Sequence, residues 1–304
     1  MNRPKLVTVS GPTAVGKTAF TIALAKALNC PILSSDSRQF YKEMSIGTAV
    51  PSEEELNQAP HYFIQHKSIH DTYTVADFET EALGVLNSLF ARTQMAILVG
   101  GSNLYTDAVI HGLDAFPEVS KEITAYWKDA FSTKGIDFLK ESLKELDPEY
   151  YTVVDLQNHV RLLRALGVCK AADKPYSSFL GQTKKSRNFD VISLTLNMPR
   201  EQLYDRINTR VDMMIAAGLI DEVQSLISFK HLNALQTVGY KELFPYIAGE
   251  ISLDESIENI KMNTRRFAKR QLTWLRNHPS THTLAHNTKV DAALMAALGI
   301  EIST

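Results

Sequence analysis

One stretch of this sequence limits the possible folds more than any other: Gly11-Pro-Thr-Ala-Val-Gly-Lys-Thr18, which fits the pattern G-x-x-x-x-G-K-[ST]. An apolar run over residues 6–10 precedes it and is typical of a buried parallel strand, and a helical pattern follows over residues 19–28. Successive backbone N–H groups and a helix N-terminus would then face one point. The order strand, loop, helix therefore predicts a polyphosphate site; the alternative is a glycine-rich turn that precedes a helix by chance.

Two side chains of this loop have chemistry of their own. Lys17 would place a point charge on terminal phosphate oxygens, and the hydroxyl of Thr18 would bind Mg²⁺. The pattern does not identify the polyphosphate, and it leaves open whether a phosphate is transferred or departs as a leaving group. The fold that it predicts is α/β, with a P-loop NTPase-like core built on a parallel sheet.

The composition sets limits on size, partners and compartment. With 304 residues, 44% of them apolar, the chain is long enough for one large α/β domain or for a domain with an insertion. Its net charge of −2 does not indicate a nucleic-acid partner, so such a partner has to be argued from local clusters. Cys30 and Cys169 have no metal-ligand spacing, which favours free thiols in a reducing compartment. We find no secretory signal and no apolar run of bilayer length, so we expect a cytoplasmic protein without a membrane anchor.

Two more buried strands are predicted, at residues 30–35 and 95–99. They lead into Asp36-Ser-Arg-Gln-Phe-Tyr41 and Gly100-Gly-Ser-Asn-Leu-Tyr105. Because ligands bind outside the carboxyl ends of parallel strands, both segments should meet the phosphate loop in one crevice. Asp36 has two interpretations there: a base that takes a proton from an acceptor, or a group that caps the next segment or holds Mg²⁺ through water.

The segment from residue 113 to residue 188 shows no strand pattern. We predict that it is an all-helical insertion domain, and that residues 1–112 and 189–304 together form the core. Between His159 and Arg187 the basic residues greatly outnumber the one acid, Asp173. This stretch is either a solvated face or the electrostatic footprint of a nucleic-acid partner.

Two predicted helices further along carry basic residues at informative spacings. Arg206 and Arg210 lie four residues apart in the helix that starts at Pro199, and no acid lies three or four positions from either. They form either a clamp for a pyrophosphate or part of a tertiary salt bridge. In the helix that runs from Ser252 toward Asn277, one face suits contact with a phosphate backbone through Arg266, Lys269 and Arg270.

Six segments together resemble the bacterial tRNA dimethylallyltransferases, the IPP transferase family, and they occur in the family's order between residue 6 and about residue 276. Each is modest alone, but jointly they are specific. They are Gly11-Pro-Thr-Ala-Val-Gly-Lys-Thr18, Asp36-Ser-Arg-Gln-Phe-Tyr41, Gly47-Thr-Ala-Val-Pro51, His61-Tyr-Phe-Ile64, Val238-Gly-Tyr-Lys-Glu242 and Ala268-Lys-Arg-Gln-Leu-Thr-Trp274. The resemblance implies transfer of a dimethylallyl group from dimethylallyl diphosphate to N6 of the adenosine just 3′ of the anticodon.

The resemblance also implies roles for individual residues. The catalytic groups would be Asp36, as general base on the adenine amine, Arg210 on the diphosphate, and Thr106. The diphosphate would be bound by Gly11, Thr13, Ala14, Gly16, Lys17, Thr18 and, as a second choice to Arg210, Arg206, with Mg²⁺ on Thr18. The tRNA anticodon stem-loop would contact Ser37, Gln39, Tyr41, Gln157, Arg161, Arg164, Tyr240, Lys241, Arg266, Lys269 and Arg270. We expect the protein to be a monomer.

Two segments depart from the family's usual pattern. Ser102-Asn103 stands where Thr-Gly is usual, which bears on the backbone geometry beside the substrate. Val50 stands where a lysine is usual, which removes a phosphate or RNA contact.

Two other functions are compatible with parts of the sequence. A P-loop small-molecule kinase using ATP would explain the loop, Asp36 and the paired arginines, but it does not readily explain the basic helix or the basic insertion. A non-catalytic RNA-binding protein with a regulatory nucleotide site would bind RNA without any group transfer.

Overall fold

The computed structural model describes residues 3–181 and 185–300 of the chain, which forms two compact units. One unit contains residues 1–110 and 187–304, and the other contains residues 111–186. The sequence placed both divisions two residues further along the chain, after residues 112 and 188.

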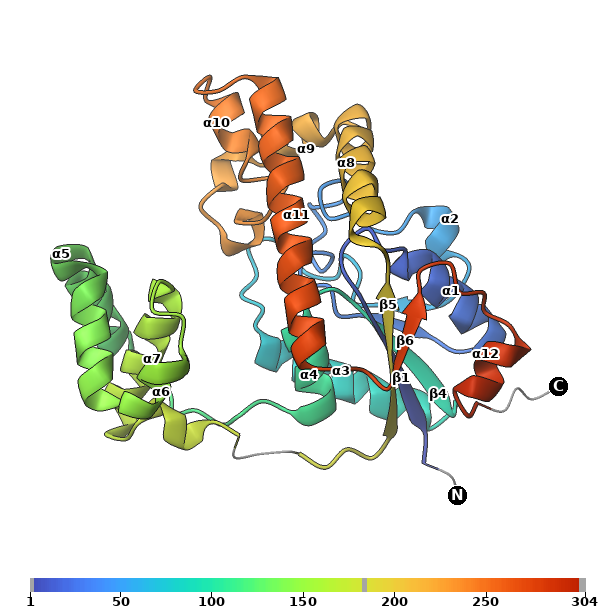
Figure 1. Ribbon diagram of the computed structural model, residues 1–304, viewed down its shortest axis with the longest axis horizontal. Helices are drawn as coiled ribbons and strands as arrows, with labels where there is room; N and C mark the ends of the chain where they lie inside the picture. The colour runs from blue at the N-terminus through green and yellow to red at the C-terminus, as the bar shows by residue number, and fades with distance from the viewer. Residues whose placement is uncertain (1–2, 182–184, 301–304) are drawn as a thin grey trace. The chain divides into compact units, whose positions relative to one another are not determined.

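The larger unit is built on a six-stranded sheet in which every pair of neighbouring strands runs parallel. In space the strands follow the order β3-β2-β4-β1-β5-β6 (Figure 1). Because β4 lies between β1 and β2, the carboxyl ends of these three strands are neighbours, and the predicted meeting of the segments that follow them is confirmed. The strands are β1 (Lys5–Ser10), β2 (Ile32–Ser34), β3 (His61–Tyr62), β4 (Met95–Val99), β5 (Asp190–Asn197) and β6 (His282–Ala285).

Helices cover both faces of this sheet because the strands are apolar on both sides. On one face, α1 and α12 pack against Val7, Ile97 and Leu194. On the other, α3 and α4 pack against Leu6 and Leu98. The helices of this unit are α1 (Lys17–Leu28), α2 (Glu53–Leu56), α3 (Val75–Phe90), α4 (Asn103–His111, whose last residue belongs to the other unit), α8 (Arg200–Ala216), α9 (Leu219–Ser225), α10 (Leu243–Ile247), α11 (Leu253–Asn277) and α12 (Ala292–Ala297).

A third hydrophobic cluster joins α8, α9, α10 and α11 to the loop that follows β2. Tyr240 lies at its centre with none of its surface exposed, and Met44 and Ile260 pack in the same cluster. Figure 1 shows α8 beyond the carboxyl end of β5, with α11 running beside α8 and down past the ends of the strands. The cluster therefore anchors the helices that border the strand ends.

The smaller unit is helical, as its sequence predicts. It contains α5 (Lys121–Leu146), α6 (Pro148–Val153), α7 (His159–Ala172) and a 3₁₀ turn over Tyr176–Phe179. Gly135, with φ of 75°, breaks α5 into two helices. The core of this unit forms around Trp127, Leu139 and Leu166.

The segment between β2 and α3 contains α2 and the two-residue edge strand β3, which is too short to produce an alternating pattern. α9 ends at Ser225, and a 3₁₀ turn follows over Ile227–Phe229. Within the described residues, every helix is too short or too polar to cross a bilayer.

Asp147 is the polar group on which the helical unit depends. Its carboxylate is completely buried, and it accepts hydrogen bonds from the backbone N–H groups of Tyr150 and Ser177 and from the Ser177 hydroxyl, at 2.7–2.9 Å. The substitution Asp147→Ala removes the N-cap of α6 and leaves these donors unpaired. We expect it to lower the free energy of unfolding by about 3 kcal/mol.

Hydrogen exchange of the α7 amides measures this loss within the unit itself. The control is Asp137→Ala, which removes an exposed carboxylate paired only with Lys140 and should change stability by less than about 0.5 kcal/mol. Equal exchange rates in the two variants would contradict the role assigned to Asp147.

Candidate active site

The phosphate loop keeps its shape through two glycines. Gly16 is the N-cap of α1 with φ of 106°, a left-handed conformation that turns the loop into the helix. Gly11 has φ of 150°, and a Cβ there would lie 2.9 Å from the carbonyl oxygen of Leu196 in β5. A side chain at Gly11 would clash with β5, and one at Gly16 would strain its left-handed backbone, so both glycines fix the path of the loop.

Three basic side chains lie at this loop. The Lys17 ammonium donates to the carbonyl oxygens of Gly11 and Pro12, each at 3.0 Å. Arg206 in α8 donates from Nε to the carbonyl oxygen of Ala14 at 2.9 Å. Arg210, one helical turn further along α8, lines the same cavity as Lys17 and Arg206.

The charged side chains at the loop shift one another's pKa values. Burial lowers the pKa of Lys17 to about 8, although the Asp36 carboxylate raises it, and the Arg210 guanidinium lowers it further. Burial also lowers the pKa of Arg210, again with Asp36 opposing the change. The phosphate loop, the end of β2 and α8 therefore supply charges to one site, as the sequence predicts.

A short turn holds Asp36. Its Oδ1 accepts from the backbone N–H of Arg38 at 3.1 Å, and its own N–H donates to the Ser34 hydroxyl at 3.3 Å. Behind it, the hydroxyls of Ser35 and Thr106 form a hydrogen bond of 2.9 Å, which places Thr106 one layer behind Asp36.

Ser102, a departure from the usual family pattern, has a clear structural role. Its hydroxyl accepts from the backbone N–H of Ser37 at 3.2 Å and forms a hydrogen bond of 3.0 Å with the Ser37 hydroxyl. It ties the start of α4 to the turn that carries Asp36.

Gln39 has its amide engaged within the protein. Its Nε2 donates to the carbonyl oxygens of Thr48 and Ala49 at 3.3 and 3.0 Å, and its Oε1 accepts from the Ser34 hydroxyl at 3.2 Å. The side chain therefore forms a fixed wall beside Asp36 and positions the loop at residues 48–49.

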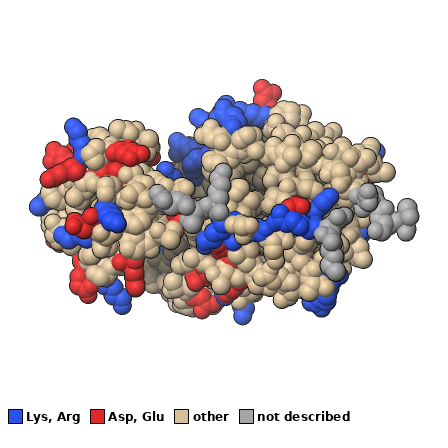
Figure 2. All heavy atoms as spheres, turned by 90° about the horizontal axis from the view of Figure 1, so that it is seen from below, with Lys and Arg blue, Asp and Glu red and all other residues tan. Residues whose placement is uncertain are grey.

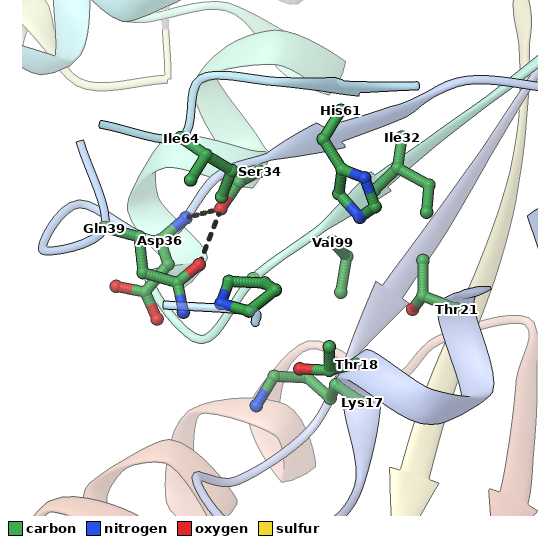
Figure 3. A pocket seen from close by; sticks show the side chains of 12 residues that line it. Lys17, Thr18, Thr21, Ile32, Ser34, Asp36, Gln39, His61, Ile64 and Val99 are labelled. Carbon is green, nitrogen blue, oxygen red and sulfur yellow. Dashed lines mark hydrogen bonds between the residues drawn. The ribbon is translucent and has the colours of Figure 1, made fainter. Parts of the chain in front are cut away.

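These groups surround a cavity (Figure 3). Its polar end is formed by Lys17, Thr18 and Asp36, and Figure 3 shows His61 and Ile32 on the other side of the opening. The lining also includes the apolar side chains of Val99, Ile64 and Pro51. A larger cavity shares Lys17, Thr18, Asp36 and Gln39 with the first and extends along α8. The site can therefore hold an anion and a small apolar group side by side.

Sequence patterns missed Glu222 in α9. Its carboxylate accepts from the backbone N–H groups of Ser45, Ile46 and Gly47 at 2.8–3.0 Å and from the Tyr240 hydroxyl. A Cβ on Gly47 would lie 2.4 Å from the Tyr240 ring. The segments 47–51 and 238–242 thus hold each other in place, and only the fold brings Glu222 to them.

Sequence patterns also missed Gln271 in α11. It is 5% exposed, its Oε1 accepts from the backbone N–H of Thr13 at 2.8 Å, and its Nε2 donates to the carbonyl oxygen of Gly101 at 2.9 Å. It therefore links the phosphate loop to the loop after β4. The available signal was a polar residue in the buried stripe of an amphipathic helix, beside Ala268 and Leu275.

The residues expected to contact RNA divide into two groups. Tyr240 is fully buried and Tyr41 is 6% exposed, so these side chains support the site from the core instead of presenting a surface to RNA, which corrects the expectation for both. The others outside the Asp36 turn are exposed: Lys241, Arg266, Lys269 and Arg270 in the larger unit, and Gln157, Arg161 and Arg164 in the smaller unit. Figure 2 shows acidic side chains among the basic ones on one face of the smaller unit, whereas α11 carries Arg266, Lys269 and Arg270 close together.

The side chains at the site determine how Mg²⁺ could bind there. Among the described residues no three His, Cys, Asp or Glu side chains gather as a metal site. Thr18 and Asp36 line one cavity and offer oxygen ligands, which Mg²⁺ prefers when phosphate oxygens complete its shell. The residues present therefore fit an ion that is carried mainly by a bound diphosphate.

In this parallel α/β fold, Lys17 and the Asp36 carboxylate share one cavity with the apolar side chains of Val99 and Ile64, and Arg206 and Arg210 border the cavity next to it. The sequence model of the family described as IPP transferase matches residues 39–278. A tRNA dimethylallyltransferase of Flavobacterium johnsoniae is 51% identical over 289 residues, covering 93% of this chain and 94% of the relative. The chain therefore belongs to the IPP transferase family, and the predicted resemblance and the prediction of a prenyltransferase are confirmed.

Solved structures agree with this assignment and with the predicted fold class. The full-length tRNA isopentenylpyrophosphate transferase of Bacillus halodurans has a TM-score of 0.71 and 34% identity, covering 98% of this chain and 95% of that one. A eukaryotic dimethylallyltransferase described as acting on tRNA has a TM-score of 0.82 and 25% identity, covering 99% and 81%. The alternative of a small-molecule kinase is not favoured.

The lowered pKa of Lys17 predicts how anion binding depends on pH. Pyrophosphate favours the charged ammonium, which is present below a pH of about 8 and is lost as the pH rises through that value. Affinity for pyrophosphate should therefore fall about tenfold between about pH 7 and pH 9. Isothermal titration calorimetry across this range measures it.

The variant Lys17→Met provides the baseline, because it shares the titration of pyrophosphate itself. This variant should bind pyrophosphate more weakly than the wild-type chain. The pH dependence of its affinity should reflect only the titration of pyrophosphate. Parallel pH profiles for the two proteins would mean that Lys17 stays charged throughout the range.

Proposed function

We propose that this chain transfers a dimethylallyl group from dimethylallyl diphosphate to N6 of the adenosine on the 3′ side of the anticodon in tRNA, and releases diphosphate. The observation that carries the proposal is the cavity in which Lys17 and Thr18 lie on one side of an apolar space and Asp36 borders it. An allylic diphosphate has this combination of an anionic end and a short apolar chain. The names of the relatives and the tRNA acted on by the eukaryotic neighbour support the acceptor.

The anionic end of the donor lies at the phosphate loop in this proposal. Backbone N–H groups of Gly16, Lys17 and Thr18, the Lys17 ammonium and the guanidinium groups of Arg206 and Arg210 face the diphosphate. As the bond between C1 and oxygen breaks, the electron pair stays with the diphosphate, and these groups stabilise its growing charge. Mg²⁺ held by Thr18 and the phosphate oxygens would add to that stabilisation.

Asp36 acts on the acceptor. The N6 amine is a poor nucleophile because its lone pair is delocalised into the purine ring. A new bond forms between N6 and C1 of the dimethylallyl group, and the Asp36 carboxylate takes the proton that N6 loses. Thr106 acts through Ser35, behind Asp36. The target base has to leave the stack of its neighbours to reach this cavity.

Two surfaces contact the tRNA anticodon stem-loop in this proposal. Arg266, Lys269 and Arg270 on α11 bind its phosphates, together with Lys241, and Ser37 and Gln39 border the target base. The smaller unit contributes Gln157, Arg161 and Arg164, which makes it a tRNA-binding insertion. We place this reaction in the cytoplasm and on a monomer.

Mass spectrometry of tRNA after incubation with the protein and dimethylallyl diphosphate tests the proposal as a whole. One prenyl group on the adenosine beside the anticodon is expected, together with equimolar diphosphate. Transfer of phosphate from ATP to an acceptor instead would favour the kinase, and RNA binding without any transfer would favour a non-catalytic RNA-binding protein.

The substitution Asp36→Ala should lower the single-turnover rate about 10²-fold or more, because the N6 proton loses its acceptor. Binding of tRNA should change much less. A control is Asp221→Ala, which removes an exposed carboxylate on α9 that lines neither cavity and should leave the rate within about threefold. A normal single-turnover rate in Asp36→Ala would exclude the base role.

Reversal of two charges on α11, by Arg266→Glu with Arg270→Glu, should weaken tRNA binding and lower the slope of log K against log salt by about 2, since two phosphate contacts are lost. Filter binding at several salt concentrations measures the slope. Lys26→Glu with Arg92→Glu is the matched control, because it changes the net charge equally at exposed positions away from the site. A slope equal to that of the control would remove this face of α11 from the RNA interface.

A further inference from the structure

Aromatic rings lie along one edge of α11, between its basic face and its buried face. Phe267 is 36% exposed, and Trp274 stacks on His278 with ring centroids 4.2 Å apart and an angle of 7° between planes. The positions 267, 270 and 274 recur at three or four residues and follow one line on α11, and His278 is the residue that caps the end of the helix. We call this line of Phe267, Arg270, Trp274 and His278 the ring stripe.

The ring stripe borders the candidate active site. Gln271 follows Phe267 by one helical turn and reaches the carbonyl oxygen of Gly101 and the backbone N–H of Thr13. A Cβ on Gly101 would lie 2.5 Å from Gln271 Nε2 and 3.7 Å from Lys17 Nζ. The helical turn that carries Phe267 is therefore next to the turn that contacts the phosphate loop.

The stripe also has charges that suit RNA. The guanidinium of Arg270 lies 5.7 Å from the centroid of the Phe267 ring, which gives a planar cation beside a planar ring. Arg266 and Lys269 are exposed on the adjoining face of the helix. An exposed large aromatic side chain among basic groups is poorly explained by solubility, whereas unstacked bases bind to such surfaces through their faces and their phosphates.

We propose that the ring stripe stacks against a nucleotide that neighbours the target adenosine. The inference rests on the proposed function, because removal of the target base from the stack exposes the faces of the bases on either side of it. Phe267 covers one such face, and Arg270 binds the adjoining phosphate. Phe267 thus stabilises the opened RNA, while Arg266 and Lys269 contribute charge alone.

The experiment uses an anticodon stem-loop RNA in which 2-aminopurine replaces one neighbour of the target adenosine, on the 5′ side in one RNA and on the 3′ side in another. Stacking on a ring changes the fluorescence of 2-aminopurine, so the signal reports the neighbour directly. The dissociation constant is measured at several salt concentrations for the wild-type chain and for Phe267→Ala, Phe267→Leu and Phe267→Tyr.

We expect Phe267→Ala and Phe267→Leu to weaken RNA binding about tenfold, with an unchanged salt slope, and to alter the bound fluorescence of one of the two RNAs. Phe267→Tyr keeps a flat ring and should stay within about twofold of the wild type. Pyrophosphate binding should be equal in all four proteins, which checks that the phosphate loop is intact.

Three results would overturn the inference: unchanged affinity in Phe267→Ala, full recovery of affinity by Phe267→Leu, or a loss of affinity that comes with a lower salt slope. Unchanged affinity in Phe267→Ala would mean that Phe267 does not contact the RNA. Full recovery by Phe267→Leu would mean that the contact is apolar packing without ring stacking. A lower salt slope would mean that the contact is electrostatic. Prenyl transfer to the unmodified stem-loop is measured with the wild-type chain alongside. Absence of transfer with normal stacking signals would reject the proposed function and leave the surface assignment standing.

Discussion

The arrangement that the rest of this site depends on is the partial burial of positive charge beside Asp36. Taking Lys17 and Arg210 out of water costs free energy, and the lowered pKa of each reports that cost. Asp36 and the carbonyl oxygens of Gly11 and Pro12 offset part of it. A diphosphate offsets more, because it brings several negative oxygens into a low-dielectric pocket. The cost of burying the cations is therefore what makes the site selective for a multiply charged anion.

Such a site needs its loops held in fixed positions, and two polar side chains do this. Glu222 gathers three backbone N–H groups of the loop at 45–47, and Gln271 joins the phosphate loop to the loop after β4. Hydrogen bonds are directional, so they fix distances that apolar contacts alone would leave adjustable. The loops are thereby positioned by residues from α9 and α11, far away in the sequence.

The sequence predicts features that depend on local residue spacing, but it does not predict contacts between residues that are far apart in the chain. Gly11 to Thr18, the strand at 95–99 and the helix from Ser252 to Asn277 are encoded by local spacing, and each is found where its pattern indicates. Glu222 is one acid on a short helix, and its partners lie some 175 residues earlier in the chain. Tyr240 stands in a recognisable segment, but only the fold reveals that its ring fills the space beside Gly47. β3 is two residues long, so it has no periodicity to detect.

The geometry of α11 shows why one helix can serve chemistry of several kinds. A helix repeats every 3.6 residues, so its side chains divide into separate faces that share a rigid backbone. On α11, Gln271 reaches into the site, Arg266 and Lys269 face solvent, and Phe267 lies between these faces. A shift of the helix when a ligand binds to its outer faces also shifts the side-chain amide of Gln271, which contacts Thr13 and Gly101. Gln271 therefore connects the surface of this helix to the phosphate loop.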